Sequence, residues 1–211
     1  MKFEIAYFST AALFTALISL SPYPFDWLLK IAPIALLIYM VSCRGICMRQ
    51  GLIITALIFS AAGDIALEIG HFTPGLAAFL VAHLAYALVF FRQPVWTSNR
   101  IISAVIVGAG AIYMATYLSP HLGDLRVPVY CYVAVIGFMA GSAVLGRGNH
   151  WLVALGAIMF TISDSMIALN RFVTPLPGAQ YWIMISYYGA QFLLTHDARN
   201  NNYAKRESST A

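Results

Sequence analysis

Apolar runs of about the length needed to cross a bilayer follow one another through almost the whole chain. Seven of them contain 16 to 20 residues, and an eighth is only slightly more polar. A helix needs roughly 20 apolar residues to cross about 30 Å of hydrocarbon, so we expect every run to be a transmembrane helix. The eight predicted spans cover residues 5–20, 26–42, 51–69, 75–91, 101–118, 128–145, 150–169 and 179–196.

Charged side chains are too scarce for a water-soluble protein. They make up 9% of the 211 residues, and 61% of the residues are hydrophobic, whereas an ordinary globular domain carries roughly 25% charged residues. The twelve Lys and Arg residues lie scattered between the apolar runs. Because they form no basic stripe or patch, nucleic acid is not an expected partner. The bilayer is the expected surrounding of this chain.

The connections between the predicted spans are all shorter than ten residues. Such short loops make consecutive helices antiparallel neighbours. We therefore predict an all-α polytopic membrane protein, with residues 1–199 forming one compact bundle of eight transmembrane helices. The polar segment 200–211 is predicted to be a disordered cytoplasmic tail. We expect the first helix to be retained, because cleavage of a signal peptide near 19–21 would leave seven spans.

Lys and Arg are distributed unevenly between the two predicted sides of the membrane. One side would carry nine of them: Lys2, Arg44, Arg49, Arg92, Arg100, Arg147, Arg199, Lys205 and Arg206. The opposite side would carry three: Lys30, Arg126 and Arg171. By the positive-inside rule both termini are predicted to be cytoplasmic. The formal net charge of +4 thus reports topology rather than an anionic partner.

Three acidic residues, Asp64, Glu68 and Asp164, fall inside predicted spans, and the two aspartates begin similar segments. Asp64 is followed by Phe72, and Asp164 by Phe172, with the same spacing and 100 residues apart. An Asp near the centre of a membrane helix costs about 2.5–3.5 kcal/mol and rarely faces lipid. If the eight helices arose by duplication of a four-helix unit, both carboxyl groups would lie at one depth in the membrane. They would then face each other across a pseudo-twofold axis along the membrane normal.

Polar residues of several predicted spans fall in the outer half of the bilayer. Asp64 and Asp164 lie about 8 Å inside the outer ends of their helices, and His83 about 12 Å. Three further side chains belong to the same layer: Lys30, Tyr187 and Tyr188. The structural alternatives are an aspartate that bonds a neighbouring helix and a core histidine that donates to a backbone carbonyl. We favour a shared polar chamber, because intramembrane ionisable groups mark functional sites.

Two neighbouring aspartates in poorly hydrated surroundings cannot readily both ionise, so they are expected to share a proton. One is then an acid and the other a base, which suits hydrolysis of an acid-labile bond. The same pair also suits peptide hydrolysis or proton-coupled transport of a small or lipid-like solute. Gly63-Asp64 is similar to the Gly-Asp pair of presenilin-like proteases, but their Pro-Ala-Leu motif is absent from the sequence.

Several motifs resemble the YhhN-like transmembrane lysoplasmalogenase family over roughly residues 25–196. The three most specific are Phe59-Ser-Ala-Ala-Gly-Asp64, Ala82-His83-Leu-Ala-Tyr86 and Ser163-Asp164-Ser165. The flanking segments that look like that family contain Lys30, Pro128-Val-Tyr130, Arg171-Phe172 and Tyr187-Tyr188-Gly-Ala-Gln191. The Gly-Asp, Ala-His-Leu-x-Tyr and Ser-Asp-Ser combination in this order makes the resemblance specific.

The resemblance implies an enzyme that hydrolyses the vinyl ether bond of lysoplasmalogens to a fatty aldehyde and glycerophosphocholine or glycerophosphoethanolamine. It implies no cofactor and no metal, and it places the protein in a bacterial cytoplasmic (inner) membrane. The expected catalytic residues are Asp64 and Asp164. The expected contacts of the lysophospholipid substrate are Lys30, His83, Tyr130, Ser163, Arg171, Tyr187 and Tyr188.

Overall fold

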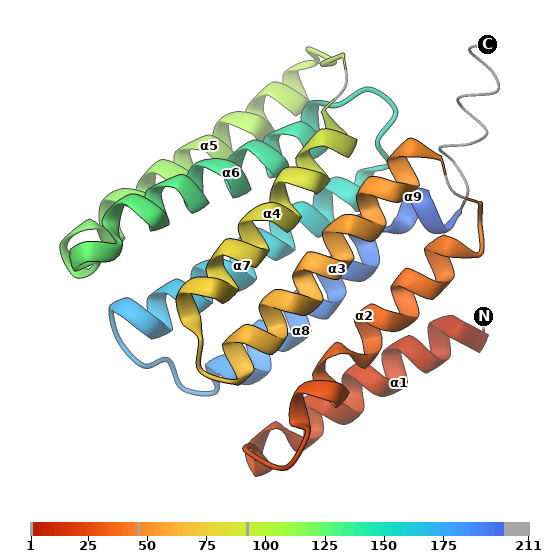
Figure 1. The fold of residues 1–211 in the computed structure, drawn as a ribbon. Coiled ribbons are helices and arrows are strands. Elements are labelled where there is room, and N and C mark those ends of the chain that lie inside the picture. The colour runs from red at the N-terminus through yellow and green to blue at the C-terminus, as the bar shows by residue number, and fades with distance from the viewer. Residues whose placement is uncertain (1, 46, 92, 201–211) are drawn as a thin grey trace. The chain divides into compact units, whose positions relative to one another are not determined.

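The computed structural model describes residues 2–45, 47–91 and 93–200. These residues form helices joined by short connections and contain no β-strand, only one isolated bridge between Pro94 and Gly146 (Figure 1). The predicted all-α class is confirmed for this part of the chain. Apart from Asn200, the tail predicted at 200–211 lies outside the described residues.

Each of the eight predicted spans coincides with a long helix, and the boundaries differ by at most three residues. The long helices are α1 (Lys2–Leu17), α2 (Asp26–Ser42), α3 (Met48–Glu68), α4 (Phe72–Phe90), α5 (Ser98–Leu118), α6 (Arg126–Leu145), α7 (Trp151–Phe172) and α8 (Ala179–Leu194). A ninth helix, α9 (His196–Arg199), was not predicted, because four residues are too few to give a hydropathy period. Three short 3₁₀ turns cover Ile18–Leu20, Ser119–His121 and Gly123–Leu125.

Six of the helical segments are long and apolar enough to cross a membrane. They contain α1 with its following 3₁₀ turn, α3, α4, α5 with its following 3₁₀ turn, α6 and α7. The chain is therefore an integral, multi-pass membrane protein. The remaining two long helices, α2 and α8, have 17 and 16 residues, so that their crossing of the membrane stays a prediction, as does the orientation of the termini.

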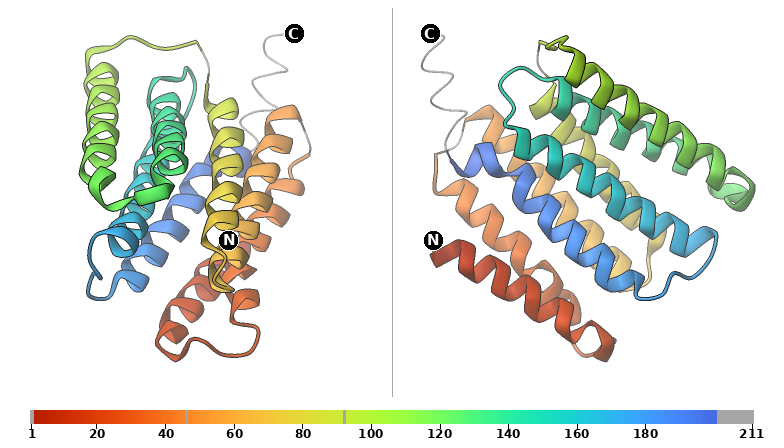
Figure 2. Two further views of the ribbon diagram at one scale, coloured as in Figure 1. Left: turned by 60° about the vertical axis from the view of Figure 1, so that its left-hand side comes forward. Right: turned by 180° about the vertical axis from the view of Figure 1, so that it is seen from behind.

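The described residues form two compact units. The first contains the residues up to Val89 together with those from Thr195 onward, and the second is Phe90–Leu194. The first unit thus holds α1, α2, α3, nearly all of α4, and α9, and the second holds α5 to α8. In the first unit α2 packs against α1 and α3, and in the second α7 packs against α6 and α8 (Figure 2).

Polar side chains fix where α3 begins and where α6 ends. The backbone N–H of Cys47 donates to Gln50 Oε1 at 3.0 Å, in a capping box that starts α3 three residues before the predicted boundary. Arg100 Nη1 donates to three carbonyls at the C-terminal end of α6: Val144, Leu145 and Gly146. Because such groups have no partner within a helix, Arg100 both caps α6 and holds α5 beside it.

Glycines allow two pairs of helices to approach closely. A Cβ atom added to Gly63 of α3 would lie 2.6 Å from ring carbons of Phe79 in α4. A Cβ atom added to Gly156 of α7 would lie 2.8 Å from the backbone N of Leu194 in α8. Small residues at helix contacts are typical of membrane proteins, where packing rather than a hydrophobic driving force holds helices together. These contacts position the helices that carry Asp64 and Asp164.

Candidate functional site

Asp64 lies on a face of α3 whose polar side chains become more exposed toward the end of the helix. Asp64 is 3% exposed, and Ser60, one turn earlier, is fully buried. Glu68 is half-buried, and His71, just beyond the helix, is exposed. Within the described residues, Ser60 Oγ has no hydrogen-bond partner. This polar face therefore has a buried hydroxyl one turn from the candidate catalytic carboxyl group.

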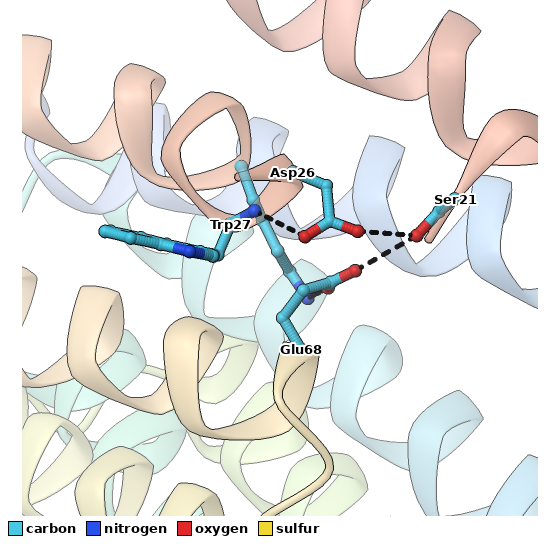
Figure 3. Close-up of polar contacts among 5 residues, drawn as sticks. Ser21, Asp26, Trp27 and Glu68 are labelled. Atoms are coloured by element: carbon cyan, nitrogen blue, oxygen red, sulfur yellow. Dashed lines mark hydrogen bonds and ion pairs between the residues drawn. The ribbon is translucent and has the colours of Figure 1, made fainter. Parts of the chain in front are cut away.

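A charged cluster surrounds Glu68 at the end of α3. Lys30 Nζ of α2 lies 2.7 Å from Glu68 Oε2, and the two side chains are only 11% and 17% exposed. The Ser21 hydroxyl is shared between Asp26 Oδ2, at 2.9 Å, and Glu68 Oε1, at 3.3 Å. Asp26 Oδ1 in turn accepts from the backbone N–H of Trp27. Figure 3 shows the Ser21 hydroxyl between the two carboxylates.

The cluster carries one excess formal negative charge, because it contains two carboxylates, Asp26 and Glu68, and one ammonium, Lys30. Its charge acts on the nearby Tyr23 phenol, whose pKa is raised by desolvation and then by those two carboxylates. The sequence placed Lys30 in the site but gave it no partner on α3. It missed Ser21 and Asp26, for which the only signal was an acidic residue in the first turn of α2.

His83 is fully buried in α4, on one face of the helix. Phe79, Tyr86 and Phe90 share this face and are buried as well. The His83 and Phe79 rings lie 6.5 Å apart between centroids and are tilted by 32°. The face is therefore a packed one that contains a single imidazole.

Asp164, on α7 of the second unit, accepts a short hydrogen bond from the Tyr132 hydroxyl of α6. The neighbouring Ser163 is fully buried, and its hydroxyl donates to the Ile183 carbonyl of α8 at 3.0 Å. Asp164 is thus bonded to α6, and the residue before it is bonded to α8. Sequence reasoning named Tyr130 and missed Tyr132, because both tyrosines lie in the same apolar run and hydropathy does not distinguish them.

Tyr187 and Tyr188 are buried on α8. The Tyr187 ring meets that of Phe160 on α7 nearly at a right angle, with 5.4 Å between centroids. The centroid of Tyr188 lies 5.4 Å from that of Tyr187. Edge-to-face pairs of this kind stabilise helix packing, so the two tyrosines form an aromatic wall beside α7.

Tyr130 and Arg171 lie at the surface of the second unit. Tyr130 donates to Ser119 Oγ at 2.8 Å, and Arg171 is exposed in the last turn of α7. Both positions are accessible to a lipid headgroup. Within the described part of the chain, no three His, Cys, Asp or Glu side chains are grouped to hold a metal ion.

Asp64 belongs to the first unit and Asp164 to the second, and their predicted pairing stays a prediction. Each unit brings one carboxyl group together with a hydroxyl-bearing residue on the same or the neighbouring helix. Each also brings in an aromatic side chain, Phe79 near α3 and Tyr132 near α7. A carboxyl group can supply a proton or accept one, which is the chemistry expected of each aspartate.

Comparison with known proteins finds relatives in mammals and bacteria. The chain is 37% identical over 157 residues to lysoplasmalogenase TMEM86A of Homo sapiens, and 35% identical over 158 residues to that of Bos taurus; each match covers 69% of this chain. It is 34% identical over 152 residues, or 68% of this chain, to a lysoplasmalogenase of Mycobacterium bovis. The matches span 64% of each mammalian relative and 58% of the mycobacterial one. No solved structure is significantly similar to the chain.

The family match covers both units. The model of the YhhN family matches residues 25–198. This range includes Lys30, Asp64, Asp164 and the aromatic wall of α8. The resemblance inferred from the sequence motifs is thereby confirmed, and the chain belongs to the YhhN family.

Proposed function

We propose that this protein is a lysoplasmalogenase, which hydrolyses the vinyl ether bond of a lysoplasmalogen to a fatty aldehyde and glycerophosphocholine or glycerophosphoethanolamine. The observation that carries the proposal is a carboxyl group on the third helix of each unit, Asp64 buried and Asp164 bonded to Tyr132. Family membership and the names of the mammalian and mycobacterial relatives support it.

The reaction needs one acid and one base. The acid protonates the vinyl carbon beta to the ether oxygen, which leaves an oxocarbenium ion. Water adds to the carbon that bears the oxygen, and its proton passes to the base. The resulting hemiacetal then collapses: its hydroxyl group gives its proton to the base, its C–O bond to the glycerol breaks, the glycerol oxygen gains a proton from the acid, and the aldehyde is released. No redox step occurs, and carboxyl groups can carry every proton.

The surroundings of the two aspartates suggest how these roles are divided. A hydroxyl donor stabilises the anion of a carboxylate, and Tyr132 supplies one to Asp164. We therefore assign to Asp164 the stabilisation of the oxocarbenium ion and the activation of water. Asp64 is the proton donor, with the Ser60 hydroxyl one turn away as a hydrogen-bonding group for water or substrate.

The remaining predicted residues have three roles. Lys30 is the phosphate ligand in this proposal, and its ion pair with Glu68 holds the ammonium in place. Tyr130 and Arg171 contact the headgroup at the surface. The buried side chains of His83, Tyr187 and Tyr188 line the alkenyl chain. Ser163 fixes α7 to α8 and thereby orients Asp164.

The same proposal includes the finer topology. All eight long helices, α2 and α8 included, cross a bacterial inner membrane within one domain of residues 1–199, and both termini are cytoplasmic. The nine-to-three distribution of Lys and Arg supports this orientation. A reporter fused after Ala211 is expected to be active in the cytoplasm, and an external signal would contradict the orientation.

Aldehyde release by the purified full-length protein tests the function. Lysoplasmalogen is compared with an acyl-ester lysophospholipid of the same headgroup, and only the vinyl ether is expected to yield aldehyde. Asp64→Asn and Asp164→Asn should abolish the release, whereas Asp124→Asn, at an exposed position, should preserve it. Flux of solute in proteoliposomes without hydrolysis would favour a transporter instead.

A further inference from the structure

A pocket of about 280 Å³ lies in the first unit, where the start of α1, the end of α2 and α9 meet. Its lining includes Phe3, Glu4, Tyr39, Met40, Arg44 and Arg199. Arg44 precedes the start of α3, and Asp64 comes 16 residues after Met48, which corresponds to about 24 Å along the helix. This pocket is therefore separate from the candidate catalytic groups.

Two guanidinium groups and one carboxylate give the pocket one excess positive charge. Arg199 is 5% exposed, and its Nε donates to Thr195 Oγ1 at 3.2 Å. Its ion pair with Glu4 is long, at 3.5 Å between Nη1 and Oε1, and the Glu4 side chain is 45% exposed. Solvent weakens a pair of that kind, so Glu4 only partly compensates the buried charge of Arg199.

The pKa of Arg199 reflects this partial compensation. Burial lowers it to about 10, Glu4 and Tyr7 act in the opposite direction, and the like charge of Arg44 lowers it further. An anion bound between the two arginines would replace their repulsion by attraction. Arginine is suited to such a role because its planar fork matches the oxygens of a phosphate.

The outer wall of the pocket is apolar. Phe3 of α1 and Tyr39 of α2 lie with their ring centroids 5.1 Å apart, and both rings are about half exposed, at 48% and 51%. Met40 extends this wall. A cationic floor next to an exposed aromatic wall matches a molecule with a phosphate head and an apolar body.

We propose that this pocket binds the phosphate of an anionic phospholipid from the cytoplasmic leaflet. The phosphate lies between Arg44 and Arg199, and the beginning of an acyl chain lies along Phe3, Tyr39 and Met40. The volume is just below the range of about 300–1,000 Å³ that is typical of small-molecule sites, which suits a headgroup rather than a whole lipid. Basic pockets between helices on the cytoplasmic side are typical sites for such lipids.

Binding would stabilise the first unit, because the ligand joins α1, the end of α2 and α9 and has no site in the unfolded chain. Free phosphate has the same head chemistry, so the test must separate the two sources. Purified full-length protein is offered phosphatidylglycerol, phosphatidylcholine or inorganic phosphate. Lipid retention is measured by native mass spectrometry, and thermal stability is measured in parallel.

The test variant is Arg44→Gln, and its matched control is Arg147→Gln. Both arginines are exposed, so that replacement leaves the helix packing intact, but only Arg44 lines the pocket. We expect phosphatidylglycerol to be retained in preference to phosphatidylcholine. Arg44→Gln should weaken this retention about tenfold, as the loss of one charge-assisted contact predicts. Arg147→Gln should leave it unchanged.

Two results would overturn the lipid proposal. Equal retention of phosphatidylglycerol by the wild type and Arg44→Gln would mean that the pocket does not hold the headgroup. Stabilisation by inorganic phosphate that depends on Arg44, without retention of lipid, would identify free phosphate as the ligand. Because retention is measured without hydrolysis, both results are independent of the proposed lysoplasmalogenase activity.

Discussion

The second and third helices of the two units contact each other through different side chains. In the first unit Lys30 of α2 donates a hydrogen bond to Glu68 of α3, one turn beyond Asp64. In the second unit Tyr132 of α6 donates a hydrogen bond to Asp164 of α7 itself. In each case the second helix of the unit supplies a donor and the third helix supplies a carboxylate.

The two units differ in the residue that stands four positions after the aspartate. Four residues after Asp64 the chain has Glu68, and four residues after Asp164 it has Ala168. The first unit therefore has a second carboxylate one turn beyond the aspartate, and this carboxylate pairs with Lys30. The second unit has no carboxylate there, and its donor bonds the aspartate itself. Similar sequence frames thus provide two carboxyl groups of unequal surroundings, as an acid and a base require.

Replacing either aspartate should have the largest effect. Asp64→Asn and Asp164→Asn should each lower kcat for aldehyde release by about 100- to 10,000-fold, because each removes one proton-transfer group. The double variant should be little worse than the single ones, since groups that act as a unit are not additive. Losses that multiply in the double variant would show that the two units act separately.

Tyr132→Phe should have an intermediate effect that is confined to the second unit. Removing the hydroxyl leaves the Asp164 carboxylate without this donor, and we expect kcat to fall about tenfold, the value of one hydrogen bond to a charged group. The exposed Tyr113 of α5 provides the control, because Tyr113→Phe should leave kcat unchanged. A normal kcat for Tyr132→Phe would remove the basis for assigning the base role to Asp164.

The ion pair of the first unit should show itself in stability. Lys30→Met and Glu68→Gln should each lower the free energy of unfolding by about 1–3 kcal/mol, because each leaves a largely buried charge without its partner. The double variant should lose less than the sum of the two. Thermal unfolding of the purified protein measures all three, and strict additivity would contradict coupling of the pair.

Gly63→Ala should have the smallest effect of the four, about 1–2 kcal/mol of destabilisation, because the added methyl group overlaps the Phe79 ring and overpacks the contact. Gly108 of α5 has no atom within 4 Å of an added Cβ, so Gly108→Ala should be neutral or slightly stabilising. Equal melting temperatures for the two variants would show that α3 and α4 can separate without cost.

The helices were predictable from the sequence, and the side-chain partners were not. The apolar run that ends at Leu118 has to be a helix, because a bilayer tolerates little else, and α5 ends at the predicted residue. Whether Tyr130 or Tyr132 meets α7 depends on the rotation and axial shift of α6. Hydropathy contains no information about either quantity, so Tyr132 and the Glu68 partner of Lys30 emerged only from the structure.

The length of α8 has a consequence for how water, the second reactant of a hydrolase, would reach a site inside the membrane. Sixteen residues rise about 24 Å, less than the roughly 30 Å thickness of the hydrocarbon core. Where such a helix crosses, the bilayer thins to match it. Solvent then comes nearer to the middle of the membrane along α8, and the distance that a water molecule must travel becomes shorter there.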